Sequence, residues 1–161
     1  MPKTKEDLRK KLAQAREDLL HWCHQLSESE WTQPVYVHDQ EWTMQDVLRH
    51  LTWAEGGMAR LIQQIRDGHE GVPSDFDLHS YNARGVDKLK DKTPAELMNM
   101  MTENRQWILR LLEEMDEQEL QLEGRHGSMR IMSIADVLRT IALHERGHLR
   151  DMRRALQETG D

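Results

Sequence analysis

The chain has 161 residues, a single cysteine and a formal net charge of −7 at pH 7. This charge argues against a general nucleic-acid binder, which neutralises phosphates with Lys and Arg, and it has the wrong sign for an anionic membrane surface. No apolar run reaches the roughly 18 residues of a membrane span, and the N-terminus has no apolar signal-peptide core. We therefore expect a cytoplasmic protein with one domain over residues 1–161.

Four long segments carry apolar residues at helical spacing. Each begins at a Ser or Thr that is followed three residues later by an acidic residue, which is the spacing of a capped helix start. The predicted helices cover residues of about 4–26, 43–68, 93–115 and 133–160. All four have one apolar face, and these faces need to be buried against one another.

The connecting segments are polar and show no alternating strand pattern. The longest, at about residues 71–91, is long enough to cross the molecule and contains a short helical pattern near His79–Leu89. Four amphipathic helices bury their apolar faces most simply in a bundle. The sequence therefore predicts an all-α fold, a four-helix bundle with a long crossover connection and one short extra helix.

A short internal similarity links the second and fourth predicted helices. TMQDVLRHL at residues 43–51 aligns with SIADVLRTI at residues 133–141, with Asp-Val-Leu-Arg in common. The two helices begin alike and present the same face inward. We therefore expect them to be neighbours in the core.

The segment IALHERGHLRDM, residues 141–152, contains two histidines four residues apart. On a helix, His144 and His148 stand one turn apart on the apolar face. Two buried imidazoles need partners, since an unsatisfied buried polar group costs about 1–3 kcal/mol. One divalent ion such as Zn, Ni or Fe satisfies both rings, so we predict a metal site at His144 and His148.

His50 is the best candidate for a third ligand, because it lies on the apolar face of the second predicted helix. The remaining histidines lie at helix ends or in connecting segments and fit less well: His21, His24, His38, His69, His79 and His126. Of these, His79 and His126 are kept as reserve ligands. The alternative is a metal-free interaction domain whose histidines are hydrogen-bonded core residues.

Three further residues near these histidines have two interpretations each. Glu55 and Glu145 either orient a ligand imidazole or lie on the solvated surface. Cys23 continues an apolar face, which favours a small core residue over a nucleophile.

The string His144-Glu145-Arg146-Gly147-His148 also matches the H-E-x-x-H pattern of zinc proteases. Such proteases take their third ligand from further along the chain, and only 13 residues follow His148. The extended form of the motif needs Gly and His where this chain has Asp151 and Arg154. A metalloprotease is therefore not expected.

Two stretches resemble the DinB-like superfamily. WTMQDVLRHLTWAE at residues 42–55 is similar to that family's helix start with a histidine, and LHERGHLRDMRRAL at residues 143–156 is similar to its His-x-x-x-His helix. The resemblance implies a metal triad of His50, His144 and His148 with open coordination positions, and it makes a homodimer plausible. The family includes thiol-dependent transferases and colibactin self-protection proteins.

This resemblance leaves two functions open. The first is a metal-dependent transferase or hydrolase that acts on a small electrophilic molecule, with a low-molecular-weight thiol as a cofactor in the transferase case. The second is a non-enzymatic protein that binds a metal or a small molecule in a stress or self-protection response. Open coordination positions are typical of catalytic metal sites and favour the first.

Overall fold

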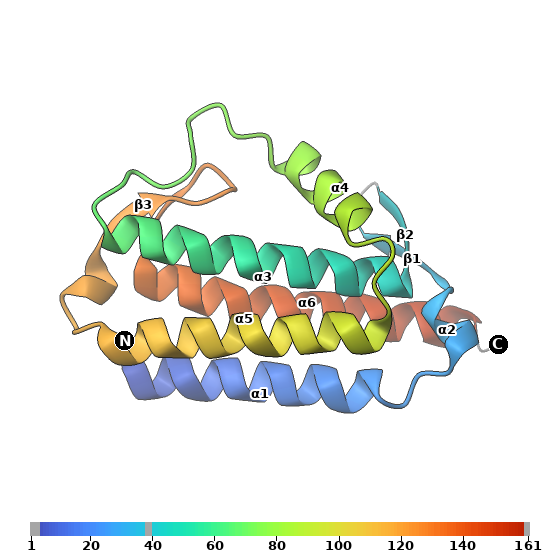
Figure 1. Cartoon of the computed structure of the whole chain (residues 1–161). Helices are drawn as coiled ribbons and strands as arrows, with labels where there is room; N and C mark the ends of the chain where they lie inside the picture. The colour runs from blue at the N-terminus through green and yellow to red at the C-terminus, as the bar shows by residue number, and fades with distance from the viewer. Residues whose placement is uncertain (1–3, 38–39, 160–161) are drawn as a thin grey trace.

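Four long helices form the bundle in a computed structural model that describes residues 4–37 and 40–159. They are α1 (Lys5–Cys23), α3 (Met44–Arg66), α5 (Pro94–Glu114) and α6 (Ile134–Thr159). Figure 1 shows that α1 and α6 run in one direction and that α3 and α5 run in the other. Helix α3 packs against α5 and α6, and α1 packs against α6 and α5. The predicted all-α four-helix bundle is confirmed, and so is the contact between the second and fourth predicted helices.

The helix starts follow the predicted capping residues. Thr4, Thr43 and Thr93 each accept a hydrogen bond from the backbone N–H three residues later. The hydroxyl of Ser133 accepts one from the N–H of Asp136 at the start of α6. Each cap satisfies a backbone donor that has no partner within its own helix, which is why the four starts could be read from the sequence.

Because α3 and α5 are consecutive long helices that point the same way, the chain between them must return along the bundle. The predicted crossover does this, and the short helix α4 (Leu78–Lys88) lies within it against α3. Two glycines allow the close approach: a Cβ on Gly57 would collide with the Tyr81 side chain, and one on Gly85 would collide with Trp53.

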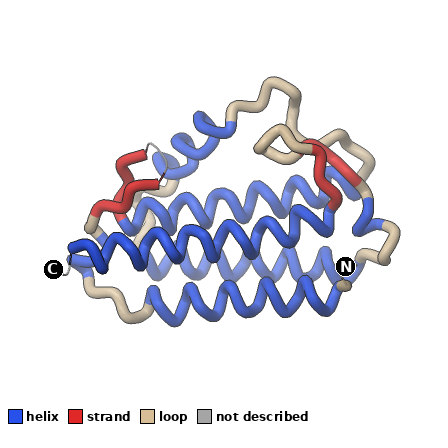
Figure 2. Tube along the Cα trace, turned by 180° about the vertical axis from the view of Figure 1, so that it is seen from behind, coloured by secondary structure: helices blue, strands red, loops and turns tan. Residues whose placement is uncertain are grey.

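Two short hairpins were not predicted, and the expectation of no strands is wrong. β1 (Pro34–Val37) pairs with β2 (Gln40–Thr43), and β3 (Glu123–Arg125) pairs with β4 (Ile131–Ser133), both antiparallel. Strands of three or four residues are too short to show an alternating pattern. The hairpins lie at opposite ends of the bundle (Figure 2). Two short helical turns, α2 (Glu28–Trp31) and η1 (Glu119–Gln121), complete the described elements.

The bundle core is divided into two apolar clusters by a charged layer. One cluster includes Leu12, Ile62 and Ile108, and the other includes Leu19, Leu48 and Met101. Between the clusters, each long helix contributes one buried charged residue, and we call these four residues the charged layer: Arg16, Glu55, Arg105 and Glu145. None of the helices in the described part of the chain is long and apolar enough to cross a membrane.

Candidate metal centre

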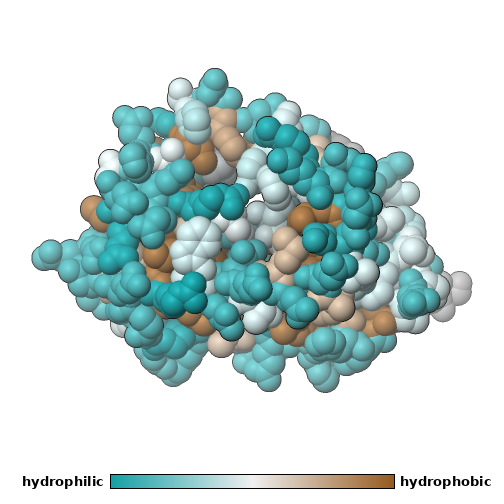
Figure 3. All heavy atoms as spheres, in the orientation of Figure 1, coloured by the Kyte–Doolittle hydropathy of each residue, from teal (hydrophilic) through white to brown (hydrophobic). Residues whose placement is uncertain are grey.

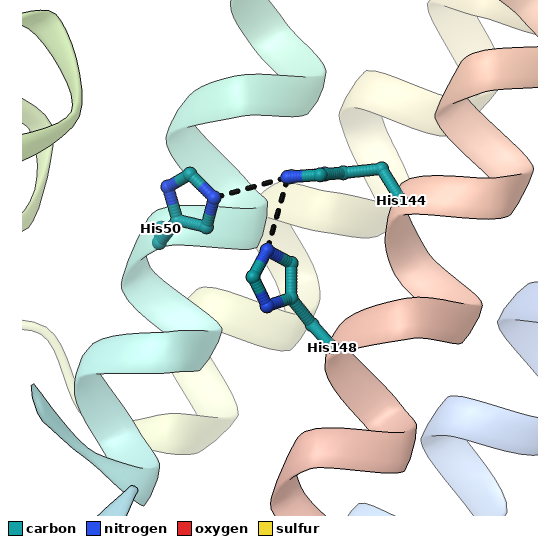
Figure 4. A group of neighbouring side chains, drawn as sticks. All are labelled: His50, His144 and His148. Carbon is teal, nitrogen blue, oxygen red and sulfur yellow. Dashed lines mark hydrogen bonds between the residues drawn. The ribbon is translucent and has the colours of Figure 1, made fainter. Parts of the chain in front are cut away.

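Three imidazoles from two helices converge beside this charged layer. His50 comes from α3, and His144 and His148 come from α6 (Figure 4). The Nε2 atom of His144 lies 3.0 Å from Nε2 of His50 and 3.1 Å from Nε2 of His148. Within residues 4–37 and 40–159, this is the one group of three or more His, Cys, Asp or Glu side chains placed to hold a metal ion, with all ligand atoms within 4.8 Å of one another.

Local packing orients the three rings. His144 and His148 are one helical turn apart, and the i, i+4 spacing directs both rings toward α3. The Trp42 ring packs against His50 with its centroid 4.9 Å away, and Asp151 Oδ2 lies 3.4 Å from Nδ1 of His148. A carboxylate beside the outer nitrogen of a ligand histidine fixes the ring orientation and leaves Nε2 as the ligand atom.

The donor set fits a metal ion better than it fits hydrogen bonds among the rings. A ring nitrogen has one in-plane direction, in which it either donates one proton or accepts one, yet Nε2 of His144 faces two other Nε2 atoms. Three imidazole ligands at 2.0–2.1 Å from a tetrahedral ion would be about 3.3 Å apart. The observed separations are close to that value, so small movements of the side chains would place all three nitrogens around one ion.

A second cluster lies next to the triad and holds the four long helices together. Arg16 Nη2 donates to both carboxylate oxygens of Glu55, at 2.8 Å each, and to Oε1 of Glu145 at 2.9 Å. Arg105 donates from Nε to Glu55 at 2.8 Å and from Nη2 to Glu145 at 3.0 Å. Two positive and two negative groups therefore balance one another at the centre of the bundle. These four residues are the charged layer that separates the two apolar clusters.

Backbone carbonyls complete the arginine contacts. Arg16 Nη1 donates to the carbonyl of Met101, and Arg105 Nη1 donates to that of Leu12. Burial lowers the pKa of Arg16, but the nearby charges of Glu55 and Glu145 outweigh it, and the net shift is upward. Burial raises the pKa of Glu55, and the opposing effect of Arg105 and Arg16 does not cancel that shift.

The surface position considered for Glu55 and Glu145 is therefore wrong, because each residue is only 3% exposed. Their hydrogen-bond donors, Arg16 and Arg105, were missed at the sequence level. Both arginines lie four residues after a buried residue, Leu12 or Met101, so helical spacing alone places them on the buried face. An arginine on such a face, with a glutamate on the facing helix, is the signal that could have found the charged layer.

The other histidines do not join the triad. His21 and His24 are exposed at the end of α1, and His79 is exposed on α4 and contacts Gln40. His69 and His126 instead line a neighbouring pocket. His38 lies outside the described residues. Cys23 is 2% exposed, and burial, with the Glu145 charge as a second cause, raises its pKa to about 12, which makes it a core residue rather than a nucleophile.

A pocket of about 580 Å³ adjoins the triad above α3. His50 and His144 form part of its wall, whereas His148 does not. The rest of the wall comes from the outer face of α3, the crossover segment with α4, the turn after β3, and Thr140 of α6. Figure 3 shows this side of the molecule, where the mostly hydrophilic surface is hollowed and apolar atoms are visible. The volume lies in the range of pockets for small molecules.

Solved structures with this fold include proteins of quite different descriptions. An uncharacterised protein from Escherichia coli UTI89 aligns with a TM-score of 0.79 at 13% identity, covering 99% of this chain and 96% of that one. The colibactin self-resistance protein ClbS, solved with a dsDNA, aligns with a TM-score of 0.72 at 16% identity, covering 100% and 98%. At such identities the likeness concerns the fold alone.

A mycothiol-dependent maleylpyruvate isomerase aligns with a TM-score of 0.70 at 16% identity, over 92% of this chain and 62% of that longer chain. No protein of curated function matches the sequence. The family model of the DinB superfamily, in contrast, matches residues 11–152, which contain all four long helices in large part and all three histidines. The chain therefore belongs to the DinB superfamily.

Proposed function

We propose that this protein is a metal-dependent enzyme, a transferase or hydrolase, that acts on a small electrophilic molecule. One observation carries the proposal: three Nε2 atoms converge at the wall of a pocket of about 580 Å³. A structural metal site has all its positions filled by protein side chains, whereas three histidines leave positions open on a typical ion. Zn, Ni and Fe all suit three imidazoles.

When bound, the ion would act as a Lewis acid and lower the pKa of a water or thiol that coordinates to it. The chain's own residues then have two tasks. His50 and His144 turn the open side of the site toward the pocket, so a bound substrate lies next to it. Trp42 and Asp151 keep the His50 and His148 rings in place.

A thiol nucleophile would have to come from outside the protein. Cys23 is buried, and its pKa of about 12 keeps it protonated near neutral pH. Membership of a superfamily whose fold is shared by a mycothiol-dependent isomerase supports a low-molecular-weight thiol as the co-substrate. The pocket, beside the triad, has room for a small molecule of this kind.

Elemental analysis of the purified protein tests the metal site. The wild type should contain about one transition-metal ion per chain, and His148→Ala should lose most of it. His148 does not line the pocket, so this variant removes a ligand without changing the pocket wall. His24→Ala is the matched control, because His24 is exposed at the end of α1. Equal metal contents in the wild type and His148→Ala would rule out the triad as the site.

The second candidate function is non-enzymatic binding in a stress or self-protection response. The colibactin self-resistance protein with the same fold supports it. The two functions differ in turnover. An enzyme should convert some member of a panel of electrophiles, offered with low-molecular-weight thiols or water, and His148→Ala should not. Metal binding by the wild type without turnover across the panel would favour the binding protein.

A further inference from the structure

Among residues 4–37 and 40–159, no acidic side chain lines the pocket, although 29 of the 161 residues of the chain are Asp or Glu. The side chains in this wall that can carry a positive charge are Arg60 and four histidines: His50, His69, His126 and His144. The histidines His50 and His144 belong to the triad, so Arg60, His69 and His126 are the ones left for contact with the rest of a ligand. A wall with an arginine and no carboxylate among its described residues favours an anion over a cation at short range, even though the net charge of the chain is negative.

Arg60 provides an uncompensated positive charge. Its Nη2 atom donates to the Tyr81 hydroxyl at 3.3 Å, and it forms no ion pair among residues 4–37 and 40–159. The neighbouring arginine on the same helix, Arg66, is different, because Glu114 and Glu119 bind its guanidinium. The guanidinium of Arg60 is exposed at the pocket, and its fork of donors suits a carboxylate or another oxyanion.

His126 provides an uncharged donor on another part of the wall. Its Nδ1 atom accepts a hydrogen bond from the backbone N–H of Ser128 at 3.1 Å. The proton of the neutral ring is therefore on Nε2, at the far side of the ring from the turn. Burial, with the charge of Arg130 as a second cause, lowers the pKa of His126, so the ring is neutral near pH 7 and donates from Nε2.

The wall that carries His126 is held in position before any ligand binds. Val72 N–H donates to the carbonyl of Arg125 at 2.9 Å, and Arg125 N–H donates to that of Glu70 at 2.7 Å. Gly71 has φ +100°, and a Cβ there would collide with the Arg125 backbone. The crossover segment is thus joined directly to the β3–β4 hairpin, and a preformed wall of this kind reduces the entropy cost of binding.

Apart from Gln64, Asn82 and Thr140, much of the remaining wall is apolar. Phe76 and Tyr81 pack with ring centroids 5.2 Å apart, and Leu78, Met58 and Val72 lie beside them. A ligand that fills this space needs an apolar body, because the displacement of water from these surfaces contributes to the binding free energy when apolar ligand atoms replace the water.

We propose that the pocket binds a small organic anion, with its acidic group on Arg60, an acceptor oxygen on the Nε2–H of His126, and its apolar body against Phe76 and Leu78. The proposal rests on the proposed function only in assigning this anion as the substrate of the adjoining metal site. It names the class of substrate that the pocket selects.

Binding of a matched series to the protein as purified tests this assignment. The probes are 4-phenylbutyrate, 4-phenylbutyramide and 4-phenylbutylamine, which share one carbon skeleton and differ in charge. We expect saturable binding of the carboxylate in calorimetric titration, at least about tenfold tighter than the amide, and no binding of the amine, because a hydrogen bond to a charged group contributes about 1.5–3 kcal/mol. Equal binding of all three probes, or no saturable binding of the carboxylate, overturns the proposal.

Variants assign the effect to the two residues. Arg60→Gln should weaken 4-phenylbutyrate binding about tenfold, and Arg153→Gln, an exposed arginine away from the pocket, should not. His126→Asn keeps an acceptor for the Ser128 N–H and removes the Nε2 donor, so it should bind more weakly than His126→Gln, which keeps an amide N–H near the Nε2 position. Unchanged affinity in both Arg60→Gln and His126→Asn overturns the proposal.

The metal content of each variant separates this inference from the proposed function. A carboxylate that binds only to the ion would be insensitive to Arg60→Gln and lost in His148→Ala, which contradicts the anion pocket and leaves the metal site standing. Carboxylate binding that depends on Arg60 in a wild-type protein without metal would have the opposite meaning. It would support the anion pocket and contradict the proposed metal-dependent enzyme.

Discussion

Glu145 and Arg16 face each other across the bundle, with Oε1 of the carboxylate 2.9 Å from Nη2 and 3.3 Å from Nε of the guanidinium. Glu145 is the second residue of the protease-like string HERGH, and in a protease it would activate water at the metal. Here its neighbours in sequence, His144 and His148, contribute to the triad, while its carboxylate belongs to the charged layer. The same five residues thus contribute two rings to the histidine triad and one carboxylate to the charged layer.

Loss of the Glu145 charge should destabilise the fold. Glu145→Gln leaves Arg16 and Arg105 buried with one carboxylate between them, and breaking a buried ion-pair network by removing one partner costs about 3–5 kcal/mol. We expect a loss of about 3 kcal/mol in the free energy of unfolding, measured by urea denaturation followed by circular dichroism. Glu117→Gln, at an exposed position, should change it by less than about 0.5 kcal/mol. A stability equal to that of the wild type would mean that the charged layer is not needed for the fold.

Removal of the metal should lower the melting temperature of the wild type. An ion that binds only the folded chain stabilises it by about 4 kcal/mol when its concentration is 1,000 times its dissociation constant. Exhaustive chelation should therefore reduce the melting temperature of the wild type, and His148→Ala should melt at one temperature with or without the chelator. If chelation leaves the wild type unchanged, the metal-free interaction domain becomes the better interpretation.

Stability should fall in alkaline solution because of Cys23. Its pKa rises from an ordinary value of 9.0 to about 12 in the fold. The unfolded chain loses this proton at lower pH than the folded chain, so the contribution is fully present below pH 9.0 and is lost as the pH rises toward about 12. The free energy of unfolding should drop by about 1.4 kcal/mol per pH unit within that window. Cys23→Ala, measured by urea denaturation at the same pH values, should show a shallower decline, and an identical decline would contradict the assignment to Cys23.

Two glycine substitutions should have opposite effects. A Cβ on Gly147 in α6 meets nothing within 4 Å, so Gly147→Ala should stabilise the helix by about 0.5–1 kcal/mol and leave the metal content unchanged. A Cβ on Gly85 in α4 would collide with the Trp53 ring, so Gly85→Ala should destabilise the protein by about 1–3 kcal/mol. Thermal melts of the two variants check both signs. Destabilisation by Gly147→Ala would show that this glycine is needed in the helix.

Much of the bundle could be predicted from local sequence, because its information is local. Thr43 and Ser133 cap their helices through hydrogen bonds to residues only three positions later in the sequence. The four-residue spacing of His144 and His148 places both histidines on one face of the helix. His50 required one further step, the recognition that its helix turns the same face inward. The convergence of the three rings follows from these separate facts and from the contact between α3 and α6.

The pairing of charges within the charged layer and the shape of the pocket wall could not be predicted from local sequence in this way. Arg16 and Glu145 meet over 129 positions of sequence, and neither residue type suggests burial by itself. The pocket wall depends on Gly71 lying beside Arg125, a contact between the crossover segment and the end of the three-residue strand β3 that no periodic pattern encodes. The single domain, the homodimer and the cytoplasmic location stay predictions.

The attachment of α4 and the β3–β4 turn to the outside of α3 bears on how such a protein could be redesigned. The three histidines are carried by the bundle, whereas Phe76, Leu78 and His126 are carried by segments outside the four long helices. Grafting new sequences into residues 68–82 and 126–130 would therefore alter the pocket wall while the histidine triad and the bundle that supports it stay intact. A library confined to these two segments offers a direct route to new binding specificities on an unaltered scaffold.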